Sequence, residues 1–202
     1  YEEIIVERHA GNESYAGACD DMRIGISLTF YLLNAGDYMN RRQNGILKEL
    51  QTSLILSGLA VSGTILLPVS KNVKQKAVDK KLSQQRNSLI VAAKNGDEDA
   101  MESLTMRDIN MYTMIYRRIQ HEDVYTIVDS YFMPYGIECD QYSLMGEITN
   151  CNMSVNSKTG EKLYQLGLIS NDIPLDICIN ERNLFGRPDV GRRFKGVIWL
   201  QG

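Results

Sequence analysis

The sequence of 202 residues predicts an α+β fold with two lobes. An N-terminal α/β lobe over residues 1–136 is expected to contain antiparallel strands and a helical middle, and a small OB-like antiparallel β-barrel or meander is expected over 137–202. Apolar residues alternate with period two both near the N-terminus and after Tyr142, and a stretch of helix-forming composition separates the two regions. The boundary is placed where Pro134 and Gly136 interrupt the helical pattern.

The N-terminal lobe is predicted to hold strands at about residues 4–6, 22–33 and 53–69. The middle strand has the clearest pattern, because every second residue from Met22 to Leu32 is apolar. Residues 34–37 tolerate positive φ, so the chain is expected to reverse there into a partner strand near Tyr38. Residues 45–56 fit either a strand or a helical stripe.

Helices are predicted over about residues 72–131, where lysine, glutamine and alanine replace the β-branched runs. Gly96 is expected to end the first helix in a left-handed cap, and Asp97 is expected to cap the next helix. The spacing of Thr105 and Asp108 has the form of a capping box, which marks a helix start. Behind it, one apolar stripe at helical spacing contains Ile109, Tyr112, Ile115, Tyr116 and Ile119.

Four short strands are predicted after Tyr142, with a hairpin turn at 157–161 and a tighter turn at Asn171 and Asp172. Short antiparallel strands interrupted by glycines resemble the OB-like barrel, which has five strands. The fifth strand is missing from this region, so it lies beyond Gly202, the sheet is open, or the resemblance does not hold. The alternating residues of the four strands are Leu144, Gly146 and Ile148; Tyr164, Leu166 and Leu168; Ile173, Leu175, Ile177 and Ile179; and Phe194, Gly196, Ile198 and Leu200.

Composition and charge exclude several classes of protein. Hydrophobic residues at 44% and charged residues at 23% are ordinary for a globular chain, so neither disorder nor a coiled-coil rod is indicated. The formal net charge of −3 gives no general attraction for nucleic acid, so any surface that binds nucleic acid has to be a local basic patch. The most apolar stretch, 53–69, is broken by glycine and proline and is shorter than a spanning helix, so no membrane partner is expected.

The four cysteines indicate the cellular compartment. Cys19, Cys139, Cys151 and Cys178 contain no CxxC pair, which argues against a zinc site. Their scatter and the absence of a secretory signal favour reduced thiols and a cytoplasmic location. Neither a metal nor another cofactor is expected.

No recognisable catalytic motif is present. His121 and Glu122 match the first two residues of an HExxH zinc-binding helix. Tyr125, however, occupies the position of the second histidine. Gly58 and Gly63 have the outer spacing of a phosphate-binding loop without its lysine, and a flexible strand or turn is the better interpretation. An enzyme remains one hypothesis, with a site between the lobes. Its candidate residues are His121, Glu122, Asp123 and Cys139.

A basic group in the last connection and strand is the candidate ligand-binding site. Alternation places Trp199 on the less apolar face of that strand, together with Lys195. An exposed aromatic ring beside cations suits single-stranded nucleic acid or another anionic ligand. The plainer interpretation, which we favour, pairs the arginines with nearby acidic residues and covers Trp199. The candidate residues are Arg187, Arg192, Arg193, Lys195 and Trp199.

A second basic stretch covers residues 71–86, which hold six lysines or arginines against Asp79 alone. A solvated helix face is the first interpretation of such a run, and a docking surface for an acidic partner is the second.

Three segments of the chain resemble a bacterial family of unknown function. They cover residues 96–105, 121–136 and 191–202, and the first and last read GDEDAMESLT and GRRFKGVIWLQG. The resemblance implies a cytosolic bacterial origin. Because the family has no assigned activity, the resemblance gives no residue here a role.

The function therefore stays open, and a non-catalytic binding or interaction protein of the bacterial cytosol is the first hypothesis. Binding of single-stranded nucleic acid or another anionic ligand by the C-terminal lobe is an alternative that we do not favour, and an enzyme with a site between the lobes is another. A protein partner or homo-oligomer is compatible with each of them.

Overall fold

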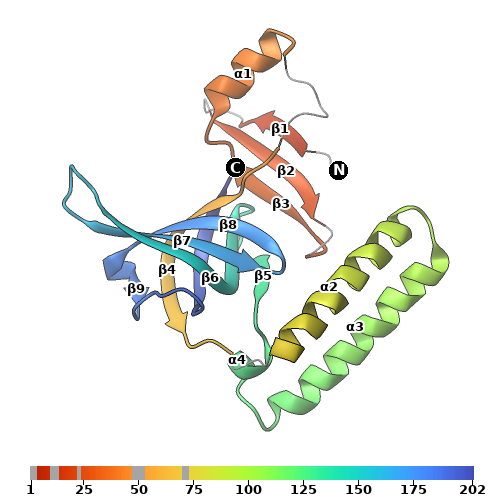
Figure 1. Cartoon of the computed structure of the whole chain (residues 1–202). Helices are drawn as coiled ribbons and strands as arrows, with labels where there is room; N and C mark the ends of the chain where they lie inside the picture. Colours follow the sequence, from red (N-terminus) through yellow and green to blue (C-terminus); the bar gives the residue numbers. More distant parts are fainter. Residues whose placement is uncertain (1–3, 10–13, 22–23, 47–52, 70–72) are drawn as a thin grey trace. The chain divides into compact units, whose positions relative to one another are not determined.

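The computed structural model describes residues 4–9, 14–21, 24–46, 53–69 and 73–202 (Figure 1). The chain forms two compact units. A β-rich unit consists of residues 1–68 and 130–202, and a helical unit consists of residues 69–129.

The described part of the β-rich unit contains one mixed sheet of ten strands. Its helical elements are α1 (Ala35–Gln43) and the 3₁₀ turn η2 (Glu181–Asn183). The strands are β1 (Ile4–Arg8), β2 (Tyr15–Asp21), β3 (Ile26–Tyr31), β4 (Ser57–Leu66), β5 (Tyr131–Pro134), β6 (Gln141–Val155), β7 (Lys162–Ser170), β8 (Ile173–Asn180), β9 (Leu184–Phe185) and β10 (Arg193–Gln201). The prediction of an α+β fold is confirmed.

Five of these strands close into a barrel in the order β4-β8-β7-β6-β10. The consecutive strands β6, β7 and β8 form an antiparallel meander, and β10 pairs antiparallel with both β6 and β4. A short parallel pairing of β4 with β8 completes the ring. The fifth strand that the C-terminal sequence lacks is therefore β4, which precedes the helical unit in the chain (Figure 1).

Glycines on β4 and β10 make room for the barrel core. Gly63 and Gly196 face each other in the β4–β10 register, and a Cβ on either one would collide with the ring of Phe194. Gly58 likewise lies against Ile198, whose Cδ1 is 2.7 Å from where a Cβ would be. The glycine spacing that mimics a phosphate-binding loop therefore serves core packing, because only a residue without a Cβ admits these side chains.

The N-terminal meander of β1, β2 and β3 joins the same sheet at the end of β10. β3 and β10 pair in parallel at Tyr31 and Gln201. The buried Tyr142 of β6 adds a second link, since its hydroxyl accepts a bond from the Thr29 amide at 2.8 Å and donates to the Cys139 carbonyl at 3.1 Å. The N-terminal strands and the barrel consequently share one core.

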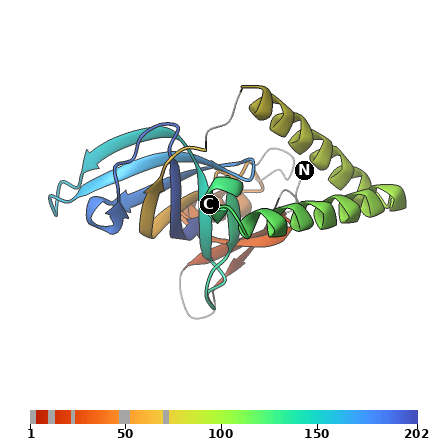
Figure 2. The ribbon, with the colours of Figure 1, turned by 90° about the horizontal axis from the view of Figure 1, so that it is seen from below.

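The helical unit contains α2 (Val73–Lys94), α3 (Glu98–Ile119) and the short α4 (Val124–Ile127). Gly96 has a φ of 88°, and the Asp97 carboxylate accepts a bond from the Ala100 amide at 3.0 Å, so both predicted caps are confirmed. The two long helices run in opposite directions and diverge from their connection (Figure 2). In the described part of this hairpin, only Ile90 and Ala100 are buried.

Two local predictions near the N-terminus are wrong. Residues after Asn34 begin α1 rather than a turn into a strand near Tyr38, and the antiparallel partner of β3 is β2, a strand that the alternation does not predict. Charge favours the helix, because Asp37 lies in its first turn and basic residues lie in its last turn, which suits the helix dipole. Of the ambiguous residues 45–56, those at 47–52 lie outside the described residues.

Two predictions in the helical region also need correction. Thr105 lies inside α3, where its hydroxyl donates to the Met101 carbonyl at 2.9 Å, so the proposed capping box does not start a helix. The last helical segment ends at Ile127, and Tyr131 already belongs to β5. That strand pairs with β6 and extends the sheet beyond the barrel.

The division of the chain differs from the boundary predicted at residue 136. Pairing of β4 with β10 over nine positions places N-terminal and C-terminal residues in one unit. The helical residues 69–129 are an insertion between two strands of that unit. In contrast, the four predicted C-terminal strands are present, and Asn171 and Asp172 adopt φ of 47° and 63°, as the tight turn between β7 and β8 requires.

Candidate functional site

Arg193 is a structural residue of the barrel. Its side chain leaves β10 on the outer face, yet the residue is only 7% exposed. The guanidinium Nε donates to the Leu67 carbonyl at 3.0 Å, and Nη1 lies 3.9 Å from the sulfur of Met145. This arginine therefore ties the segment after β4 to the wall of the barrel.

Arg187 and Arg192 lie together in the connection before β10. Nη1 of Arg192 donates to the Arg187 carbonyl at 3.2 Å. The Gly191 amide donates to the Ile148 carbonyl at 2.8 Å and anchors the loop to β6. Within the described residues, neither arginine forms an ion pair with a carboxylate, so the predicted pairing with acidic neighbours is absent there.

Lys195 and Trp199 lie on the outer face of β10, as the alternation predicts. Trp199 is 37% exposed and stands between Leu59 of β4 and Gln141 of β6. It is six residues from Arg193, which is about 20 Å along a strand. The structure thus separates the tryptophan from the arginines and leaves Arg187 and Arg192 as the pair that lies close together.

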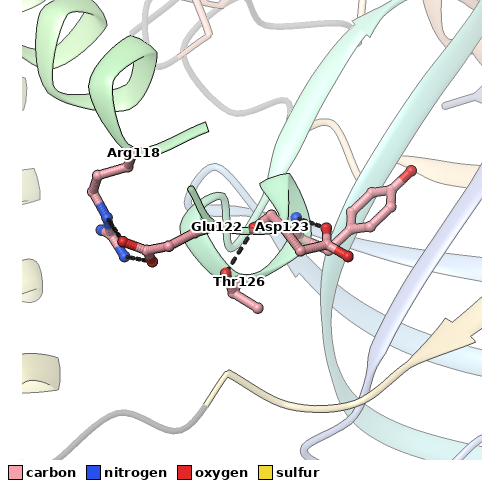
Figure 3. Close-up of polar contacts among 5 residues, drawn as sticks. Arg118, Glu122, Asp123 and Thr126 are labelled. Atoms are coloured by element: carbon pink, nitrogen blue, oxygen red, sulfur yellow. Dashed lines mark hydrogen bonds and ion pairs between the residues drawn. The ribbon is translucent and has the colours of Figure 1, made fainter. Parts of the chain in front are cut away.

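Two of the four residues proposed for an enzyme, Glu122 and Asp123, make contacts at helix ends (Figure 3). Glu122 pairs with Arg118, with Nη2 and Oε2 2.6 Å apart, and hydrogen bonding from this guanidinium lowers the pKa of Glu122. The Asp123 carboxylate accepts a bond from the Tyr125 amide at 2.8 Å and caps α4. An ion pair and a helix cap therefore explain the presence of both carboxylates, and neither explanation needs a catalytic role.

The outer face of β6, β7 and β8 is polar and lacks aromatic rings at its centre. In register there lie Asn150, Gly167 and Asp176, followed by Asn152, Gln165 and Cys178. OB-type proteins that hold single strands combine stacking rings with cations, and this face presents neither in those six positions.

The four cysteines are free thiols. Cys19 is buried and Cys139 is exposed. Burial raises the pKa of both Cys151 and Cys178, which keeps these thiols protonated at neutral pH. Among the residues that the structure describes, no group of three or more histidine, cysteine, aspartate or glutamate side chains could hold a metal ion. None of the described helices combines the length and apolar character needed to cross a membrane.

The outward face of α3 is the surface that sequence analysis did not recognise as a candidate site. We call Ile109, Tyr112, Tyr116 and Ile119 the α3 stripe. These side chains are 54%, 68%, 70% and 48% exposed, respectively. Met101, Met106, Met111 and Met114 add further exposed apolar side chains around the same helix. At these exposures the hairpin leaves the α3 stripe uncovered.

Comparison with known proteins identifies a family. The family model described as a domain of unknown function from E. rectale (DUF3881) matches residues 1–202. The chain belongs to this family. No curated protein and no solved structure matches it.

Among the described residues of this DUF3881 chain, the α3 stripe and the Arg187–Arg192 loop are two surfaces whose chemistry suits contact with another molecule. The stripe offers apolar area with two tyrosines, a combination enriched at protein interfaces. The loop offers two guanidinium groups, which suit an anion.

Proposed function

We propose that this chain is a non-catalytic interaction protein of the bacterial cytosol that docks another protein surface on the α3 stripe. The observation that carries the proposal is the exposure of the stripe, since each of its four residues is about half exposed or more. Contiguous exposed apolar patches on soluble domains usually mark interaction sites.

Packing within the helical unit supports this proposal. Ile90 and Ala100, its buried residues in the described part, both lie near the connection between α2 and α3. Beyond that point the helices diverge (Figure 2), and the apolar residues of α3 other than Ala100 are half-buried or exposed. A two-helix hairpin with so small a core gains stability when another surface packs against it.

Site-specific photo-crosslinking tests the docking surface for any protein occupant. A benzophenone side chain at position 116, introduced into the full chain and irradiated in lysate of the bacterium that carries it, is expected to give a discrete crosslinked band. The matched control places the same group at Asn110, which is exposed on the same helix and lies about 120° round from Tyr116.

Replacement of Ile109 and Tyr112 by aspartate should abolish the band at position 116, because two charges on the stripe oppose apolar docking. The proposal fails if position 116 gives no discrete band, or if Asn110 gives the same one.

Binding of an anionic ligand, single-stranded nucleic acid included, is a second proposal, now limited to Arg187 and Arg192. Its support is the absence of a carboxylate partner for either arginine within the described residues. Arg187→Ala with Arg192→Ala is expected to weaken binding of a labelled single-stranded oligonucleotide and to lower the slope of log K against log salt by about 1.4. Arg182, which pairs with Glu161, is the control. An equal effect of Arg182→Ala, or no salt-dependent binding, would count against this ligand.

A further inference from the structure

We propose that the site at Arg187 and Arg192 takes a nucleotide unit of a single strand, with Phe185 as the ring on which the base stacks. This inference rests on the second proposal above, and it adds the residue that would read the base. Stacking of bases on aromatic rings beside cations is the common way in which proteins hold single strands.

Phe185 is an aromatic residue on the outer face of the β-rich unit. In β9, Leu184 is in register with Gly63 of β4, and Phe185 is in register with Thr64 (Figure 1). Leu184 packs against the barrel core, so the next side chain along the strand points outward. Phe185 is 79% exposed. The face of its ring is therefore open to a base.

The backbone after Phe185 keeps the ring close to Arg187. Gly186 has a φ of 95° and turns the chain over β4, where an added Cβ would lie 3.2 Å from Cβ of Ile65. Pro188 is buried, so packing holds the residues on both sides of the exposed Arg187. The Cα atoms of Phe185 and Arg187 are two residues apart, which is at most about 7 Å.

Arg192 adds a second guanidinium group to this loop. Its Nη1 donates to the Arg187 carbonyl at 3.2 Å, and its own carbonyl accepts a bond from the Ile148 amide at 2.8 Å. Because a guanidinium carries several N–H donors, the bond to Arg187 leaves others for a phosphate. The loop therefore holds one half-buried and one exposed arginine beside an exposed ring.

Asp189 is the acidic residue between the two arginines. Its carboxylate accepts a bond from the Val190 amide at 3.0 Å. Burial and, after it, the charge of Asp189 raise the pKa of Cys151, so this carboxylate lies near β6. Within the described residues it forms no ion pair with either arginine, which leaves both guanidinium groups for an external anion.

The exposed ring favours a single strand over other anions. A bare phosphate, or the carboxylates of an acidic protein, would engage the two arginines and leave Phe185 in water. In a duplex the faces of the bases are stacked on one another. A ring can stack on a base only where the strand is single, so the ring and the cations together suit this class of ligand.

Fluorescence anisotropy of a labelled single strand of about 12 nucleotides tests the ring in the full chain. Phe185→Ala is expected to weaken binding about 5- to 150-fold. Phe185→Leu should lose nearly as much, because leucine is apolar but has no π-face, whereas Phe185→Trp should keep the affinity. Ile5→Ala is the matched control, since Ile5 is a strand residue of the same unit and is 55% exposed. Wild-type affinity of Phe185→Ala, or an equal loss in Ile5→Ala, would overturn the inference.

Salt dependence separates this inference from the proposal on which it rests. Phe185→Ala removes no phosphate contact, so the slope of log K against log salt should equal that of the wild type. The slope should fall by about 1.4 when both arginines are replaced by alanine. Loss of binding in the arginine variant alone would overturn the stacking ring and keep the anion site. Absence of salt-dependent binding by the wild type would overturn both.

An abasic strand of the same length tests the base itself. It keeps the phosphates, so the wild type should bind it more weakly by the factor that Phe185→Ala loses, and Phe185→Ala should bind both probes equally. Equal binding of both probes by the wild type would overturn the stacking. A nucleoside triphosphate at the same concentration of bases should not displace the strand, because the strand offers more phosphates. Displacement would assign the site to a free nucleotide and overturn the strand.

Discussion

Gly196→Ala is expected to lower the free energy of unfolding of the β-rich unit by about 3 kcal/mol, the upper part of the usual range for overpacking a core. A Cβ at this position would clash with the backbone carbonyl of Ser62 on β4 and would lie 2.5 Å from Cζ of Phe194. Neither neighbour can give way easily, because Ser62 is held in the β4–β10 pairing and Phe194 is fully buried. Denaturant unfolding followed by fluorescence measures the change.

The matched control for this variant is Gly36→Ala. Gly36 lies in α1 and has open space where a Cβ would stand. Alanine also favours a helix over glycine by up to about 1 kcal/mol, so this variant should leave stability unchanged or raise it slightly. Equal stability of Gly196→Ala and the wild type would mean that β4 does not pack against β10 as described.

Tyr142→Phe is expected to destabilise the β-rich unit by about 1–3 kcal/mol. The ring can stay beside Phe132, whose centroid is 5.1 Å away, but the Thr29 amide loses its acceptor and the Cys139 carbonyl loses its donor. Tyr164→Phe is the control, because Tyr164 is a half-buried tyrosine that packs against the same core. An equal loss from the two variants would exclude a special role for the Tyr142 hydroxyl.

The advantage of Tyr142 over phenylalanine should depend on pH. Burial raises the pKa of Tyr142 above its ordinary value of 10.0, although the bond from Thr29 acts in the opposite direction. Above that pH the unfolded chain loses the phenolic proton while the folded chain keeps it, so deprotonation stabilises the unfolded state. The difference in unfolding free energy between wild type and Tyr142→Phe is therefore full below pH 10 and shrinks as the pH rises further. A difference that stays constant across this range would contradict the burial of the hydroxyl.

The sequence predicted the strands of the barrel better than their assembly. Alternation located β6, β7, β8 and β10, because each has one face in the core and one toward solvent. The same alternation cannot show that β4 pairs with β10, since that contact joins residues more than a hundred positions apart. The alternation alone therefore leaves three explanations for the missing fifth strand, and it favours a boundary at residue 136 that the β4–β10 pairing crosses.

Local chemistry predicted caps and turns where one residue type decides the geometry. Gly96, Asp97, Asn171 and Asp172 adopt the expected conformations, because a left-handed φ or a free helix amide admits few residue types. It did not predict α1, whose mixed polar sequence fits a turn as well as a short helix.

The candidate site followed the same pattern. Arg187 and Arg192 lie together as neighbours in sequence suggest, but Arg193 is buried and Trp199 lies far along the strand. The apolar stripe of α3 was visible in the sequence. Its exposure was not, because periodicity shows which residues share a helix face and does not show whether another element covers that face.

The central claim is that β4 closes the barrel between β8 and β10, with the helical unit inserted after it. Nuclear Overhauser contacts in the isotope-labelled full chain test this pairing directly. We predict contacts between Leu59 and Trp199 and between Gly63 and Gly196, together with the parallel contact of Gly58 with Ile177. Contacts of β4 that stay within its own segment, with β8 and β10 left as open edges, would contradict the barrel.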